Sequence, residues 1–97
     1  MKNRTPITID KTLIFGEWED QNSRVTYSKE YKFYGTFDKY QIKQQELGNF
    51  EINEDTLQMH FTSINHHPSY IITNITANEF TIQSLGDGAI FYKKRVK

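Results

Sequence analysis

Apolar and polar residues alternate along most of the chain, in short runs that end at clusters of turn-forming residues. The longest regular run extends from Val25 to Phe33, where every second residue is apolar or aromatic except Lys29. A period of two places successive side chains on opposite faces of a β-strand. Lys29 would then be a charge on the apolar face, and we interpret it as the site of a β-bulge rather than as a ligand anchor.

This pattern repeats eight times. The expected strands are separated by turns rich in Gly, Asn, Asp and Ser, and they occupy residues 13–18, 25–33, 37–44, 48–52, 57–61, 70–75, 80–85 and 89–95. Gly35 is expected to reverse the chain between the second and the third of these strands. Each strand with its turn takes about 10 to 12 residues, which indicates hairpins that follow one another in sequence order.

Eight sequential strands leave two unpaired edges unless the first strand pairs with the last. The pattern therefore predicts an all-β fold, an eight-stranded antiparallel up-and-down β-barrel; the alternative is a β-sandwich of the same strands. We expect an N-terminal arm over residues 1–12 and a single barrel domain over residues 13–97.

Composition indicates what fills such a barrel. The 97 residues include seven Phe, six Tyr and one Trp, and a chain this short needs large side chains to build a core. An eight-stranded barrel is just wide enough to be filled by its own side chains or to hold one small ligand. We expect a mostly filled interior, with any ligand cleft shallow and near the open mouth.

Charge and hydropathy exclude some partners. Twelve basic and twelve acidic residues are mixed along the chain, so no basic patch for nucleic acid is predicted. No apolar run is long enough to span a membrane or to form the core of a signal peptide. As given, the chain is expected to be cytoplasmic; it would be exported if a leader peptide has been removed.

Catalytic and metal-binding motifs are missing from the sequence. It contains no cysteine, no Gly-x-Ser-x-Gly motif and no glycine-rich phosphate loop. His60 is expected on the outer face of a strand, while His66 and His67 fall in a loop, which is not the spacing of a metal site. We therefore expect no enzyme, no metal and no cofactor.

Aromatic hydroxyl groups are the candidates for ligand binding. Tyr27, Tyr31, Tyr40 and Tyr70 each carry a hydroxyl that needs a partner when it is buried, and Met59 is expected to point inward beside them. A few polar groups in an apolar cavity are typical of small-molecule sites. The other interpretation is that the tyrosine rings fill the core and their hydroxyls reach solvent at the rim.

Several segments carry a family resemblance. They comprise residues 13–18, ending in Gly-Glu-Trp, then 33–37, 48–53 followed by 57–59, and 70–72 followed by 75–80. In this order and spacing they resemble the small bacterial lipocalin-like domains, over about residues 13–94. The resemblance implies a calycin-type eight-stranded barrel in which Trp18 sits at the closed end. It also implies a basic residue of the last strand packed across the indole; Lys93 and Arg95 are both candidates, and we assign the role to Arg95.

A second surface is indicated by strands that are apolar on both faces. A barrel wall that is buried on one side needs apolar residues on only one face of each strand. The expected first, sixth and last strands have them on both faces, and the additional apolar residues are Ile14, Phe15, Ile71 and Phe91. Closure of the barrel would place the first and last strands side by side, so these residues could form an interface for a protein partner or a homodimer. The other interpretation is that residues 6–9 of the arm fold back over them.

Two functions follow from these patterns. The first is a small non-enzymatic binding protein of lipocalin-like type, which holds a small apolar ligand in or at the mouth of a tyrosine-rich barrel. The second is a protein interaction module, an inhibitor or an assembly subunit, with a filled barrel and an outer apolar surface.

Overall fold

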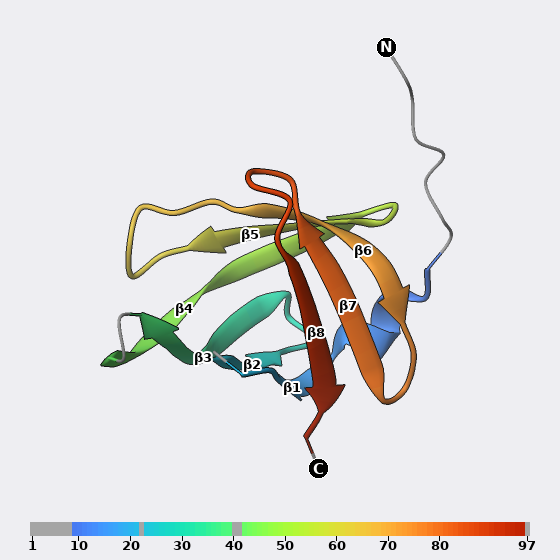
Figure 1. The fold of residues 1–97 in the computed structure, drawn as a ribbon, viewed down its shortest axis with the longest axis horizontal. Helices are drawn as coiled ribbons and strands as arrows, with labels where there is room; N and C mark the ends of the chain where they lie inside the picture. The colour runs from blue at the N-terminus through green and yellow to red at the C-terminus, as the bar shows by residue number, and fades with distance from the viewer. Residues whose placement is uncertain (1–8, 22, 40–41, 97) are drawn as a thin grey trace.

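The chain folds as eight strands preceded by one short helical turn (Figure 1). The computed structural model describes residues 9–21, 23–39 and 42–96, and the side chains of residues 38–44 are outside the description. A 3₁₀ helix, η1, covers Lys11–Ile14. The strands are β1 (Gly16–Glu19), β2 (Ser23–Tyr27), β3 (Lys32–Lys39), β4 (Ile42–Asn53), β5 (Thr56–Phe61), β6 (Ser69–Ile75), β7 (Glu79–Ser84) and β8 (Ile90–Arg95).

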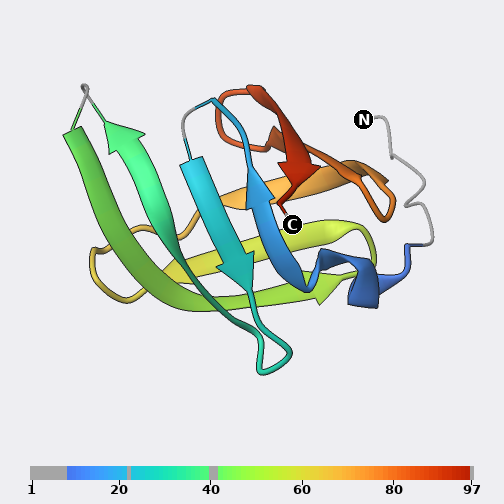
Figure 2. The same cartoon turned by 90° about the horizontal axis from the view of Figure 1, so that it is seen from below.

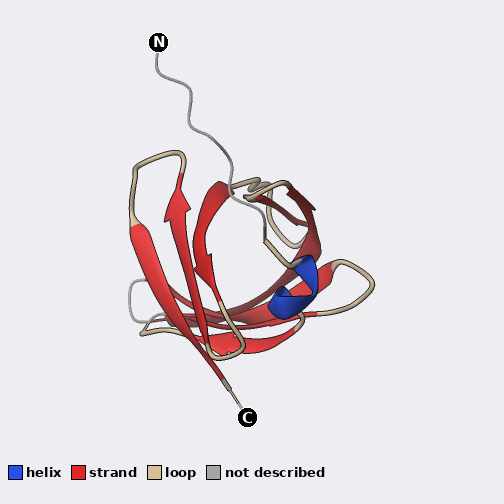
Figure 3. Cartoon of the chain, turned by 90° about the vertical axis from the view of Figure 1, so that its right-hand side faces the viewer, coloured by secondary structure: helices blue, strands red, loops and turns tan. Residues whose placement is uncertain are grey.

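Every strand pairs antiparallel with the next one, and β8 pairs antiparallel with β1. The strands therefore encircle a common axis, and η1 lies at one end of the ring (Figure 3). This confirms the predicted all-β, up-and-down barrel, and the sandwich alternative is wrong. Closure leaves no long unpaired sheet edge, which explains how so short a chain can support eight strands.

The seam between β1 and β8 is the shortest pairing in the barrel. Only Trp18↔Arg95 and Glu19↔Lys94 are in register there, whereas β3 and β4 pair over eight positions. Figure 2 shows β1 lying between β2 and β8. A short backbone ladder contributes few hydrogen bonds, so side-chain contacts must help to hold the first and last strands together.

The chain reverses after Tyr27, six residues before the end of the longest alternating run. The prediction that residues 25–33 form one strand is therefore wrong. Residues 28–31 form the β2–β3 turn, in which the Tyr31 amide donates to the Ser28 carbonyl at 3.0 Å, and Tyr31 has a positive φ of 62°. Lys29 is exposed in this turn, which explains why it breaks the pattern without a bulge.

Gly35 lies inside β3 and not in a turn, so the predicted reversal at this residue is also wrong. Its register partner is Val25 of β2, and a Cβ atom on Gly35 would lie 2.8 Å from the Val25 Cα. The backbones approach too closely there for any side chain. Glycine at this position permits close strand packing, and β3 and β4 form one long hairpin in place of the predicted strands 37–44 and 48–52.

Trp18 and Arg95 lie at the end of the barrel that η1 covers, which we call the closed end. Trp18 is fully buried, its Nε1 donates to the Ile14 carbonyl at 2.8 Å, and its ring packs 5.2 Å from that of Phe80. The Arg95 guanidinium carbon lies 4.0 Å from the centre of the indole. This is the geometry of a cation–π contact.

Arg95 also binds the backbone that leads into β1. Its Nη1 donates to the Phe15 carbonyl at 2.6 Å, and its Nη2 donates to the Leu13 carbonyl at 2.7 Å. A third bond runs from Nε to the Ala77 carbonyl at 3.1 Å. One side chain thus ties together η1, the β6–β7 turn and the end of β8, and Gly16 with its φ of 119° leaves room for it.

Within the described chain, no helix is both long and apolar enough to cross a membrane.

Replacing Arg95 with Met should lower the free energy of unfolding by about 2 to 4 kcal/mol, because the cation–π contact is lost and backbone carbonyls lose their donor. Urea denaturation followed by Trp18 fluorescence measures this change. The matched control is Lys94→Met, which removes the same charge from the exposed neighbouring residue and should cost less than about 1 kcal/mol. Equal losses in the two variants would contradict the assigned role of Arg95.

Candidate functional site: a cavity at the open end

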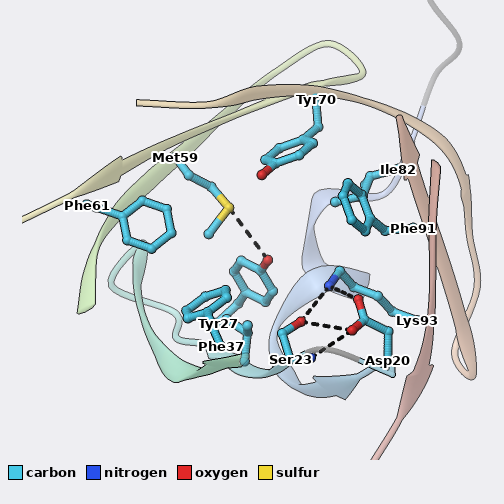
Figure 4. Close-up of a pocket in the computed structure, with 11 residues that line it drawn as sticks. Asp20, Ser23, Tyr27, Phe37, Met59, Phe61, Tyr70, Ile82, Phe91 and Lys93 are labelled. Atoms are coloured by element: carbon cyan, nitrogen blue, oxygen red, sulfur yellow. Dashed lines mark hydrogen bonds and ion pairs between the residues drawn. The ribbon is translucent and has the colours of Figure 1, made fainter. Parts of the chain in front are cut away.

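A cavity of about 270 Å³ opens at the end of the barrel opposite η1 (Figure 4). We call this the open end; it carries the β1–β2, β5–β6 and β7–β8 turns. Apolar side chains form most of the cavity wall: Val25, Phe37, Met59, Phe61, Ile82 and Phe91. Five polar side chains complete the lining: Asp20, Ser23, Tyr27, Tyr70 and Lys93. The closed half of the barrel is packed, so the cavity occupies only part of the interior.

Tyr27 forms the floor of the cavity. Its ring is buried and packs edge-on against Phe50 and Phe80, with centroids 5.1 and 6.2 Å away. Its hydroxyl points into the cavity and contacts the Met59 sulfur at 3.9 Å, a weak acceptor (Figure 4). Burial raises the pKa of Tyr27 well above its ordinary value of 10.0, and nearby Tyr70 and Asp20 raise it further. The side chain is therefore a neutral hydrogen-bond donor over the whole physiological range.

Tyr70 brings a second hydroxyl to the same cavity. It lies at the start of β6, and its ring meets Phe91 edge-on with centroids 6.2 Å apart. Burial raises the pKa of Tyr70, and the negative charges of Asp87 and Asp20 act in the same direction. The hydroxyl is directed into the cavity (Figure 4). Two neutral phenols thus face the apolar wall of the cavity.

An ion pair between Lys93 and Asp20 lies on the remaining side of the cavity. The Lys93 ammonium donates to Asp20 Oδ2 at 2.7 Å and to Ser23 Oγ at 3.2 Å. Asp20 Oδ1 in turn accepts from the Ser23 amide at 2.8 Å and from its hydroxyl at 3.1 Å. The ion-pair side chains are only 7% and 9% exposed. Burial at this level requires each charge to have a partner, and here each one has.

The alternation of β8 explains why a lysine is buried here. Phe91, Lys93 and Arg95 share the inner face of the strand, while the residues between them face solvent. Asp20 directly follows β1, and Ser23 begins β2, so the β1–β2 turn carries the partners of Lys93 across the seam. The ion pair therefore links the first hairpin to the last strand at the open end.

Three of the five residues predicted to bind ligand meet in the cavity: Tyr27, Met59 and Tyr70. Tyr31 does not, because it lies in the β2–β3 turn at the closed end. There its ring contacts Phe15 and Phe50, with centroids 5.7 and 5.3 Å away. Tyr40 lies outside the described residues.

The residues predicted to form an outer apolar interface do not share a face. Ile14 is fully buried, because residues 11–14 turn as η1 under the barrel instead of extending as a strand. Phe91 points inward and lines the cavity, and Phe15 packs against the core. Ile71 is half-buried on the outer face of β6. The prediction of one continuous patch over these four residues is wrong, since it assumed that the first strand begins at residue 13.

Sequence reasoning missed the polar side of the cavity and most of its wall. The lining residues that it did not assign to the ligand site are Asp20, Ser23, Val25, Phe37, Phe61, Ile82, Phe91 and Lys93. A signal for Lys93 was present, because it has the same parity as Phe91 and Arg95 on one short strand. No comparable signal exists for Asp20, which occupies a turn. Only the closed topology brings that turn against β8.

The histidines lie outside the barrel wall. His60 Nδ1 is 3.1 Å from His67 Nδ1, and His60 Nε2 is 3.0 Å from Glu51 Oε2. The His66 ring contacts that of Phe61 in a tilted arrangement, with centroids 5.2 Å apart. Among residues 9–21, 23–39 and 42–96, no group of three His, Asp or Glu residues is arranged to hold a metal ion.

Comparison with protein families, with curated proteins and with solved structures finds no significant match for this chain.

The raised pKa values of Tyr27 and Tyr70 predict a loss of stability at alkaline pH. Below about pH 10 the phenols are protonated in both the folded and the unfolded chain, so their contribution to the free energy of unfolding is fully present. Above that pH the unfolded chain ionises first, and each buried phenol should cost about 1.4 kcal/mol of unfolding free energy per pH unit. Tyr27→Phe should reduce this slope, whereas the exposed Tyr34→Phe should keep it. The measurement is urea denaturation at a series of alkaline pH values; identical slopes in both variants would contradict the burial argument.

Proposed function

We propose that this protein is a small, non-enzymatic binding protein of lipocalin-like type, which holds a small and mostly apolar ligand in the cavity at the open end. The observation that carries the proposal is the cavity itself, which joins an apolar wall to a few converging polar groups. This combination is typical of small-molecule sites, in which the wall supplies affinity and the polar groups orient the ligand.

The size of the cavity sets the size of the ligand. Small-molecule pockets usually measure about 300 to 1,000 Å³, and this one, at about 270 Å³, is just below that range. A small aromatic molecule or an aliphatic chain of medium length is the size class that suits it. The ligand would contact Phe37, Phe61 and Phe91 along its length and reach Tyr27 at the floor.

The alternative function as an interaction module has less support. It required a filled barrel and an outer patch, but the open half of the interior is hollow and two of the four patch residues point inward. The closed-barrel architecture is compatible with the resemblance to lipocalin-like domains. Lipocalins with large ligand cavities are longer chains, and the small cavity agrees with the shorter length of this one.

Filling the cavity mouth should weaken binding. With the uncharged fluorescent probe N-phenylnaphthylamine, Phe91→Trp is expected to weaken binding by about tenfold or more, because the larger ring occupies the ligand's space. Tyr92→Trp is the matched control: it places the same side chain one residue away on the outer face, where Tyr92 is 71% exposed, and should leave the affinity unchanged. The probe is excited outside the tryptophan absorption band.

Two results would overturn the proposal. The first is a probe that fails to bind the unmodified protein, and the second is equal binding by the two tryptophan variants. Native mass spectrometry of protein purified from its own organism adds the identity of the ligand, since a retained small molecule would appear as a mass above that of the chain.

A further inference from the structure

The Asp20–Lys93 ion pair gives the cavity two opposite charges that already neutralise each other. It spans the β1–β2 turn and β8 with a 2.7 Å contact, and both side chains line the cavity. The other titratable groups in the described lining are Tyr27 and Tyr70, which are neutral phenols. The described lining therefore carries no net charge, although it contains an ammonium group.

A charged ligand would gain little from such a lining. A carboxylate placed near the Lys93 ammonium would also lie near the Asp20 carboxylate, so attraction and repulsion would nearly cancel. Its loss of hydration on entering the apolar space would then be uncompensated. The same argument holds with the signs reversed for an amine.

An uncharged oxygen atom meets a better environment. Lysine has three N–H donors; Asp20 and Ser23 accept two from Lys93, and the third has no acceptor among the described residues. The hydroxyls of Tyr27 and Tyr70 add two further donors that point into the cavity (Figure 4). The polar side of the site is thus rich in hydrogen-bond donors and carries no net charge.

We propose that the Asp20–Lys93 pair makes this cavity selective for uncharged ligands with an oxygen acceptor, such as an alcohol, a ketone or an amide, and that it rejects carboxylates and amines. The inference rests on the proposed function, since it specifies the ligand class of the same cavity. Asp20 and Lys93 are then specificity-determining residues. Removing the charge of Asp20 should favour anionic ligands, and removing the charge of Lys93 should favour cationic ones.

Three ligands with one aliphatic chain and different head groups test this selectivity. Octanol, octanoate and octylamine are each used at neutral pH to displace N-phenylnaphthylamine from the unmodified protein. Octanol should bind at least about tenfold more tightly than either charged analogue. Its hydroxyl can form hydrogen bonds in the cavity without bringing in a charge that has no counter-ion there. Octanoate or octylamine binding as tightly as octanol would overturn the inference while leaving the proposed function intact.

Two charge variants test which residues are responsible. Asp20→Asn leaves Lys93 unpaired and should strengthen octanoate binding by about tenfold relative to octanol. Lys93→Met removes the cation that neutralises the Asp20 carboxylate, so this variant should instead favour octylamine. Bound octylamine should also raise the thermal unfolding midpoint of that variant. The matched controls are Glu19→Gln and Lys94→Met, which remove the same charges from exposed neighbours and should leave the wild-type order of the three ligands.

The outcomes separate the two proposals. If the probe and all three ligands fail to bind, the proposed function is wrong. If they bind but the two variants do not shift the preference in opposite directions, the ion pair does not set the ligand charge. A variant that fails to fold leaves the other variant and the wild-type order of the ligands to decide.

Discussion

The closure of the barrel between its first and last strands is the constraint on which the rest of this structure depends. The backbone ladder there is the shortest in the fold, with only two positions of β1 and β8 in register. Two cations on the inner face of β8, Lys93 and Arg95, compensate for it from inside. Arg95 holds the indole of Trp18 and the backbone before β1 at the closed end, and Lys93 holds the β1–β2 turn through Asp20 at the open end. Because Lys93 and Arg95 lie two residues apart on the same face of β8, their side chains stabilise both ends of the seam between β1 and β8.

This arrangement divides the interior into two unlike halves. At the closed end, Phe50 and Phe80 pack against the ring of Tyr27, Trp18 packs against Phe80, and η1 covers that end of the barrel. At the open end, residues from the ends of β3 and β5 and from the beginnings of β2, β6 and β8 surround a space that the packed side chains do not fill. Tyr27 marks the boundary, since its ring belongs to the packed half and its hydroxyl to the hollow half. A core of this kind can stabilise the fold and still leave room for a ligand.

Much of the fold could be predicted from the sequence because alternation and turn residues are local signals. They identified eight strands, their order and closure, and the resemblance pointed to Trp18 and Arg95. They failed where a local pattern had two meanings. The odd-numbered apolar series resumes at Tyr31 in the β2–β3 turn after a single break at Lys29, so it resembled one continuous strand. Gly35 allows close strand packing where a turn was expected. The tyrosines and Met59 of the cavity could be proposed from their inward parity, but the partners of Lys93 could not. Asp20 is far from β8 in sequence and meets it only in the closed barrel.

The Arg95 contacts have a further consequence, which concerns the order of folding. Each hairpin joins residues close in sequence, whereas the Arg95–Phe15 bond joins residues 80 positions apart. The entropic cost of joining chain ends grows with the logarithm of the loop length, and folding slows as the mean sequence separation of contacts rises. The hairpins can therefore form before the seam does, and the ring becomes one cooperative unit only when residues near both termini have met. The contacts of Lys93 and Arg95 that close the barrel are thus among those with the greatest sequence separation in the protein.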